Sequence, residues 1–549
     1  MPWFPQSLSA SLLLSALIGT GVPNVALAQF SIGPTRISPR LGQSFPSNQD
    51  GPSREFPDRG REPSRRRPGG SLLFDFRLPI LTNPRPQPPT SPFDAVSGSR
   101  TQFESRFQQA DPEMALRMFE ALQIREYERA FDLEFQRLLP GVEDIARTLA
   151  QRAQETGQRG ALVQIVVLQN EVHLLMVPPQ ASPVAQLQPV QIAASELPSG
   201  LLAQAQPPVV IRQVLTDVGQ ARLQQVIAQF RREISDPAKI HTQSYRPAAQ
   251  QLYQWLVAPL EPHLRANQID TLLFSMDDGL RTTPMAALHD GQQFLIQKYG
   301  VALLPSFGWT ETRKINLARH SILAMGISEG RDGLAPLPAV PVELHTVTQK
   351  LWQGQGTVAL NEASTLENLR DLHRQTHFGI IHLATHAELM PGAIDNSFIQ
   401  FWDDRLTLRQ LRQLSKDLAW NTIPAVELLV LSACDTALGS KDAELGFAGS
   451  ALNAGVRSTV ASLWAINDRA TLGLMSHFYA HLRTAPTKSE AMRQTQLAML
   501  SGEVQVVNNQ LRLASSQWIA LPPELVSQHS LQFAHPYFWS GYTVIGNWN

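Results

Sequence analysis

Two apolar runs decide the fold of this sequence: Phe378-Gly-Ile-Ile-His-Leu-Ala-Thr (378–385) and Val426-Glu-Leu-Leu-Val-Leu-Ser-Ala (426–433). Both are short, rich in branched residues and without helical periodicity, which is typical of strands buried on both faces. His386 directly follows the first run, and Cys434, the only cysteine in the chain, follows the second. In an open α/β sheet, ligands bind at the carboxyl ends of the strands. The two residues therefore mark a candidate site.

The sequence around these runs alternates between strand and helix patterns. We expect further buried strands at 271–276, 301–305 and 322–327, and helices at 340–351 and 366–375. The loop at 328–338 contains two glycines and two prolines, which suits a shaped loop at the carboxyl end of a strand. Together the elements predict an α/β fold with a mostly parallel central sheet and helices on both of its faces.

The sequence also predicts helices, a hairpin and a surface insertion outside the central strands. A helical segment covers 101–137, where Asp111-Pro112 provides an N-cap and a first-turn proline. A hairpin is expected at 161–177, followed by helices at 211–234 and 245–264. Residues 503–530 are polar, and we expect them to form an irregular surface insertion.

Composition excludes some classes of function. The formal net charge of −1 over 549 residues implies no strong field for nucleic acid. A single cysteine rules out an intramolecular disulfide and a multi-cysteine metal site. His382 lies mid-strand and is expected to be a hydrogen-bonded interior group, because no third ligand for zinc accompanies it and His386. We expect no metal and no cofactor.

The N-terminal part of the sequence predicts export followed by a tether. Residues 1–28 resemble a secretory signal peptide, with an apolar run and the small-residue cleavage pattern Ala26-Leu27-Ala28. We therefore expect a periplasmic or extracellular protein without an integral membrane span in its mature form. Residues 29–100 form a Pro/Arg-rich segment, with 13 prolines between 31 and 100. That composition predicts a disordered linker, because it buries too little apolar surface to offset ordering entropy.

His386 and Cys434 suit nucleophilic catalysis. A histidine beside a cysteine keeps the thiolate ionised or accepts its proton, and it then protonates the leaving amine. The backbone N–H groups of Cys434 and Ala387 are candidate donors to an oxyanion. Asp435 and Glu444 are candidates for a substrate pocket, although a turn or helix cap explains Asp435 better. Cys434 follows His386 by 48 residues, close to the caspase spacing of about 50.

Several motifs in order resemble the CHAT domain, a caspase-like module related to separases. They are Asp278-Gly-Leu-Arg-Thr-Thr-Pro-Met-Ala-Ala-Leu, His382-Leu-Ala-Thr-His-Ala, Leu431-Ser-Ala-Cys-Asp-Thr-Ala-Leu-Gly, Glu444-Leu-Gly-Phe-Ala-Gly, Ala454-Gly-Val-Arg-Ser-Thr-Val-Ala-Ser-Leu-Trp and His535-Pro-Tyr-Phe-Trp. The resemblance covers 138–549, leaving 101–137 as a helical lead-in. Many relatives have glycine where this chain has Ala387. Bacterial members often carry tetratricopeptide repeats, which are not recognisable in this sequence.

The resemblance implies a caspase-like three-layer sandwich and a cysteine endopeptidase with His386 and Cys434 as its dyad, acting on a protein or peptide substrate. Related enzymes often favour a basic residue before the cleaved bond, which the carboxylates of Asp435 and Glu444 would suit. A catalytically silent scaffold of the same fold is the main alternative. A cysteine acyltransferase is a third, because it differs only in the group that accepts the acyl chain. The sequence leaves the oligomeric state open.

Overall fold

The computed structural model describes residues 92–131, 139–180, 210–391, 396–422, 424–436, 440–513, 517–526 and 531–549. The predicted signal peptide, 1–28, and most of the predicted linker, 29–100, lie outside these ranges. The last residues of that linker form a short helix, α1 (Pro92–Ala95), and the N-cap of the next helix, Ser99. The linker prediction is therefore too long at its C-terminal end.

One 13-stranded sheet organises the described residues, with the path β10-β9-β8-β11-β12-β17-β5-β4-β1-β2-β3, and β6 pairing with β7 and β8. The bounds are β1 (Gly160–Val167), β2 (Val172–Val177), β3 (Ile211–Leu215), β4 (Thr271–Met276), β5 (Gly300–Leu303), β6 (Ile322–Gly326), β7 (Gly356–Leu360), β8 (Ile380–Leu389), β9 (Phe398–Gln400), β10 (Arg405–Thr407), β11 (Leu428–Thr436), β12 (Ser458–Ser462) and β17 (Tyr542–Gly546).

Most neighbouring strands of this sheet are parallel, as the sequence predicts. β6, β8, β11 and β12 form one parallel group, and β17, β5, β4 and β1 form another. β17 joins the two groups, because it runs antiparallel to β12 and parallel to β5. The buried strands are the near-continuous apolar runs of the sequence, since strands covered on both faces need no polar side.

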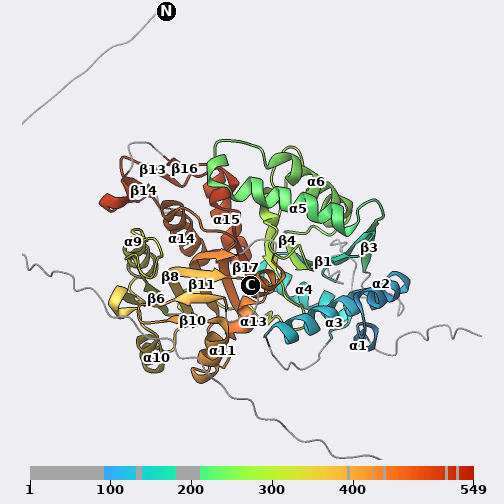
Figure 1. Cartoon of the computed structure of the whole chain (residues 1–549), viewed down its shortest axis with the longest axis horizontal. Coiled ribbons are helices and arrows are strands. Elements are labelled where there is room, and N and C mark those ends of the chain that lie inside the picture. Colours follow the sequence, from blue (N-terminus) through green and yellow to red (C-terminus); the bar gives the residue numbers. More distant parts are fainter. Residues whose placement is uncertain are drawn as a thin grey trace, which may run out of the picture. The chain divides into compact units, whose positions relative to one another are not determined.

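Helices cover the sheet. They are α2 (Arg100–Gln109), α3 (Pro112–Phe131), α4 (Val142–Thr156), α5 (Gln220–Ser235), α6 (Arg246–Leu256), α7 (Glu261–Ala266), α8 (Leu295–Lys298), α9 (Val340–His345), α10 (Leu366–Gln375), α11 (Leu408–Asp417), α12 (Lys441–Ala448), α13 (Ser450–Ala454), α14 (Asp468–Leu482) and α15 (Lys488–Leu500). In Figure 1, α9 and α14 lie above β6, β8 and β11, and α10 and α11 lie below them. None of the described helices is both long and apolar enough to span a bilayer.

The helical lead-in is part of the same core. Phe103 and Phe107 of α2 and Phe119 of α3 are fully or almost fully buried. The carboxylate of Asp111 accepts a hydrogen bond from the N–H of Met114 at 2.8 Å, which confirms the predicted cap at the start of α3. The burial of the three phenylalanines shows that α2 and α3 pack on the rest of the chain.

Two predictions of local structure are wrong. The helix expected at 211–234 is a strand, β3, followed by α5, because Ile211–Leu215 adds to the free edge of β2. The segment at 503–530 is not irregular. It contains most of a four-stranded sheet of β13 (Gln505–Val507), β14 (Gln510–Arg512), β15 (Trp518–Ala520) and β16 (Leu531–Gln532). Asn508 and Asn509, with φ of 49° and 60°, form its first turn, and two asparagines are a known signal for such a turn.

Candidate active site

The two candidate catalytic residues lie on neighbouring parallel strands. His386 belongs to β8 and Cys434 to β11, and the register pairs Cys434 with Ala387 and His386 with Ala433. Both strands continue past the candidates, to Leu389 and Thr436, so neither residue follows the end of its strand as expected. The side chains of residues 433–436 are outside the described atoms. The backbones of the two residues are adjacent.

An irregularity in the pairing lies immediately before His386. Leu383 pairs with Leu431, and the next printed pair, His386 with Ala433, uses one extra residue on β8. An unbroken register would have placed His386 opposite Cys434. Hydrogen bonds hold both sides of this bulge: Thr385 Oγ1 donates to the carbonyl of Gln400 at 2.8 Å, and Tyr542 Oη donates to the carbonyl of Ser432. Bulges beside active sites re-aim side chains.

A backbone carbonyl orients the ring of His386. Its Nε2 atom lies 2.8 Å from the carbonyl oxygen of Ala335. A carbonyl oxygen only accepts hydrogen bonds, so Nε2 carries the proton of the neutral ring and Nδ1 is left as the basic nitrogen. The ring is partly exposed. His386 is thus held in one tautomer, which suits a group that must take up a proton at Nδ1.

Ala335 belongs to a loop that we call the strap, Ser328–Ala339, which connects β6 to α9 and passes over His386. At its start, the side chain of Asn361 accepts a hydrogen bond from the N–H of Ser328 at 2.8 Å. In its middle, the guanidinium of Arg331 lies 3.8 Å from the ring centroid of Trp402. A strap tied at several points keeps the Ala335 carbonyl in place.

The end of the strap is held by a carboxylate. The N–H of Ala339 donates to Oδ2 of Asp468, the first residue of α14, at 2.6 Å. Burial raises the pKa of Asp468 to about 7, and the nearby charge of Glu343 acts in the same direction, against the bond from Ala339. The carboxylate that ties the strap therefore changes its charge near neutral pH.

Two other predicted site residues, Ala387 and Asp435, lie in the paired strands of the sheet. Ala387 lies inside β8, with Ile399 of β9 on one side and Cys434 of β11 on the other. Its backbone is therefore in the sheet and not in a turn. Asp435 pairs with Glu388 through the backbone, and its side chain is outside the described atoms. The positions of Ala387 and Asp435 do not by themselves give either residue a catalytic role.

Glu444 is bound inside the protein. Only 1% of its side chain is exposed, and Oε1 lies 2.9 Å from Nη2 of Arg231 on α5. The same carboxylate accepts hydrogen bonds from the N–H of Gly279 at 2.8 Å and from Oγ1 of Thr282 at 3.0 Å. Because these partners occupy both oxygens, Glu444 offers no free carboxylate to a substrate. It instead ties α12 to α5 and to the turn after β4.

His382 is a satisfied core residue, as predicted. It is fully buried, with Nε2 2.9 Å from Oε1 of Glu343 and Nδ1 3.0 Å from the hydroxyl of Tyr479. Within the described ranges, no three residues among histidine, cysteine, aspartate and glutamate form a group that could hold a metal ion.

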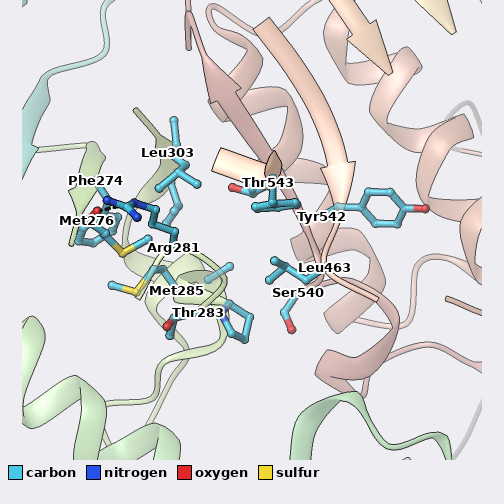
Figure 2. Close-up of a pocket in the computed structure, with 15 residues that line it drawn as sticks. Phe274, Met276, Arg281, Thr283, Met285, Leu303, Leu463, Ser540, Tyr542 and Thr543 are labelled. Carbon is cyan, nitrogen blue, oxygen red and sulfur yellow. Dashed lines mark hydrogen bonds between the residues drawn. The ribbon is translucent and has the colours of Figure 1, made fainter. Parts of the chain in front are cut away.

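The cavity drawn in Figure 2 is separate from these residues. It has a volume of about 20 Å³ and is lined mainly by β4, β5 and β17 and the turn after β4, including Arg281 and Thr283. Such a volume holds about one water molecule. In Figure 2 the hydroxyl of Tyr542 points away from the cavity, consistent with its bond to Ser432. This cavity is too small for a peptide substrate.

Comparison with known proteins gives the family. The sequence model of the CHAT domain matches residues 246–547, more than half of the chain. The protein therefore belongs to the CHAT domain family. No curated protein matches the sequence significantly.

Similar folds occur among solved structures. A Saccharomyces cerevisiae separase–securin complex matches with a TM-score of 0.38 and 9% identity, over 83% of this chain and 35% of that chain. A second such complex has a TM-score of 0.41, 8% identity and coverages of 83% and 34%. The Arg-specific cysteine proteinase gingipain R matches with a TM-score of 0.32 and 10% identity, over 60% of this chain and 74% of that chain. The chain spans about a third of the separase chains.

The sequence pointed to the strap but not to its function. Its glycines and prolines predicted a shaped loop after β6, and β6 lies next to β8 in the sheet. Nothing in the residue types indicates that the carbonyl of Ala335 meets His386, because every residue has a carbonyl.

Proposed function

We propose that this protein is a cysteine endopeptidase that uses His386 as general base and acid and Cys434 as nucleophile. The observation that carries the proposal is the position of His386, held at Nε2 by the Ala335 carbonyl, on the strand that pairs with the strand of Cys434. Membership of the CHAT domain family supports it. Nδ1 takes the thiol proton, the thiolate attacks the peptide carbonyl, and Nδ1–H then protonates the leaving amine. Water hydrolyses the acyl-enzyme.

The reactivity of Cys434 tests the dyad directly. The rate of alkylation by iodoacetamide should exceed that of an unperturbed thiol at neutral pH, and it should fall in His386→Ala. Because Cys434 is the only cysteine, the modified residue is unambiguous. Equal rates in the wild type and in a folded His386→Ala variant would exclude His386 as the partner of the thiol.

Peptide cleavage tests the activity. Wild type and Cys434→Ala are incubated with a diverse peptide library, and the products are identified by mass spectrometry. Cleavages present only with the wild type support the proposal, and the residue before each cleaved bond gives the specificity. We expect a basic residue there, with Asp435 as its partner, because Glu444 is occupied by Arg231. Identical products from both proteins would remove the peptidase assignment.

One observation favours a silent scaffold of the same family. Ala387 is flanked by β9 and β11, so its N–H lies within a paired region of the sheet and is less free to bind an oxyanion than a turn N–H. If the protein is a scaffold, the Cys434→Ala variant should keep its fold and still bind the partner. Pull-down of the same partner by both forms, with no cleavage by either, would decide for this function.

Export is part of the proposal. The apolar run and the pattern Ala26-Leu27-Ala28 support cleavage by a signal peptidase before Gln29. N-terminal sequencing of the protein recovered from its native host should begin at Gln29. A native N-terminus at Met1 would contradict export by this route.

A further inference from the structure

A cleft of about 240 Å³ opens far from the strap, between α2, α3, the turn after β4 and the start of α12. Its apolar lining comes from Val96, Phe103, Leu122 and Val167, and its charged lining from three arginines, one lysine and three carboxylates. In Figure 1, α2 and α3 lie next to each other at the right of the view. A concave site that combines apolar side chains with a few charged groups is typical of small-molecule binding.

Every carboxylate of the cleft has a cation of its own. Asp277 pairs with Arg100, Glu126 with Arg281, which lies behind the cleft, and Asp278 with Lys441 at 3.1 Å. These pairs account for all the acidic side chains of the lining.

Two arginines of the cleft lining have no ion-pair partner among the described residues. Arg125 and Arg129 form no ion pair with any described residue. They are four positions apart on α3, so their side chains leave the same face of the helix about 5–6 Å apart. Two adjacent guanidinium groups without a counter-charge repel each other, and an anion between them removes the repulsion.

The N-terminus of α2 adds a second source of positive potential. Gly98 and Ser99 line the cleft, and Ser99 is the N-cap of this ten-residue helix. The N–H groups of Ser99 and Gln102 are already bound in a capping box, so the terminus contributes through the helix dipole, which favours an anion. The helix dipole and the arginine pair therefore act on the same cleft.

From this arrangement we propose that the cleft is a binding site for a small dianionic oxyanion, a phosphate or a phosphate monoester, held by Arg125 and Arg129. A planar guanidinium binds two oxygens of a phosphate at once, which makes arginine suited to this ligand. Leu122, a partly exposed apolar residue of the lining, contacts the organic part of a monoester. Phenyl phosphate should therefore bind more tightly than inorganic phosphate.

The site has a connection to the candidate nucleophile through Lys441. This residue begins α12, seven positions after Cys434, and its ammonium contacts Asp278 and Glu126 at the cleft. Burial opposes the charge of Lys441, but Glu126 and Asp278 raise its pKa. A bound dianion competes with these carboxylates for Lys441 and so biases the segment that leads back to Cys434. This coupling rests on the proposed function, whereas the binding does not.

Isothermal titration calorimetry of the full chain tests the binding, with inorganic phosphate, phenyl phosphate and benzoate as probes. We expect both phosphates to bind the wild type, and Arg125→Gln/Arg129→Gln to bind phenyl phosphate at least tenfold more weakly. Arg147→Gln/Arg374→Gln is the matched control, because both arginines are exposed, pair only with a neighbour on their own helix and lie outside the cleft. Its affinity should equal that of the wild type.

The experiments test the binding of phosphate in the cleft and its coupling to Cys434 separately. Equal affinities in the wild type and both double variants, or no binding of either phosphate by the wild type, overturn the site. Tight binding of benzoate overturns the preference for a dianion. If the double variant is unfolded by circular dichroism, the single variants Arg125→Gln and Arg129→Gln replace it. A Cys434 alkylation rate unchanged by saturating phenyl phosphate removes the coupling and leaves the binding site and the peptidase assignment standing.

Discussion

Arg231 and Glu444 form a buried ion pair, with Nη2 and Oε1 2.9 Å apart and 7% and 1% of their side chains exposed. The pair joins α5 to α12, the helix that follows Cys434. Arg231 also donates hydrogen bonds to the carbonyls of Gly279 and Thr282. Three segments that are distant in the sequence therefore meet at this pair.

Removing one charge of this pair should be costly. Glu444→Gln leaves the guanidinium of Arg231 buried without a counter-charge, and we expect it to lower the free energy of unfolding by about 3–5 kcal/mol. Urea unfolding followed by circular dichroism measures the change. The double variant Arg231→Met/Glu444→Leu should lose less than Glu444→Gln, because it leaves no unpaired charge. A loss below about 1 kcal/mol, the value of an exposed pair, would mean that the pair is solvated.

Loosening the strap should slow the chemistry at Cys434. Asn361→Gly removes the side chain that holds Ser328, while glycine keeps the backbone φ of 52° at low cost. The side chain of Asn361 bonds the N–H and the hydroxyl of Ser328 and the carboxylate of Glu329. The loss of a single hydrogen bond of about 1 kcal/mol already predicts an alkylation rate about fivefold lower, so we expect at least this slowing. Asn316→Gly is the control, because Asn316 caps a turn at Ala318 away from the strap. Equal slowing in both variants would assign the effect to general destabilisation.

The stability of the protein should depend on the ionisation of Asp468. Its pKa is raised from 3.8 to about 7, so the folded state holds this proton more tightly than the unfolded state. The free energy of unfolding should therefore decline as the pH rises from about 4 through 7. Asp468→Asn keeps an acceptor for Ala339 and does not ionise, so its stability should decline less over the same range. Parallel curves for the two proteins in urea would contradict the raised pKa.

His382, the buried histidine of β8, should contribute to the stability of the fold and not to the reactivity of Cys434. Tyr479→Phe removes the partner of Nδ1 of His382, and leaving that nitrogen unsatisfied predicts a loss of about 1–3 kcal/mol in the free energy of unfolding. Chemical denaturation measures the loss. The alkylation rate of Cys434 under native conditions should stay at the wild-type value. A change in that rate with unchanged stability would show that His382 acts on the site.

The sequence was informative where the structure depends on local patterns. The apolar runs before His386 and Cys434 predicted β8 and β11, and their parallel pairing brings the two backbones together. The interior role of His382 followed from its place in the strand. These features need only the burial of a strand on both faces.

The rest depends on contacts between distant residues. Arg231 and Glu444 are 213 positions apart, and neither residue type indicates that the other is its partner. The bulge before His386 arises from a mismatch between two strands, and the strap acts through a carbonyl that carries no signature of residue type. The turn at Asn508 and Asn509 is different, because its signal was present and the surrounding polar composition concealed it.

The position of β17 has a consequence for biosynthesis. This strand is the only link between β12 and β5 along the described sheet, and it follows every other described strand in the sequence. A nascent chain on the ribosome therefore exposes two unpaired edges, one on each half of the sheet, until the residues from Tyr542 to Gly546 have emerged. Unpaired edges recruit other strands and promote aggregation. Chaperones that shield such edges during translation would thus raise the yield of folded protein, and premature termination a few codons before Tyr542 would yield aggregates.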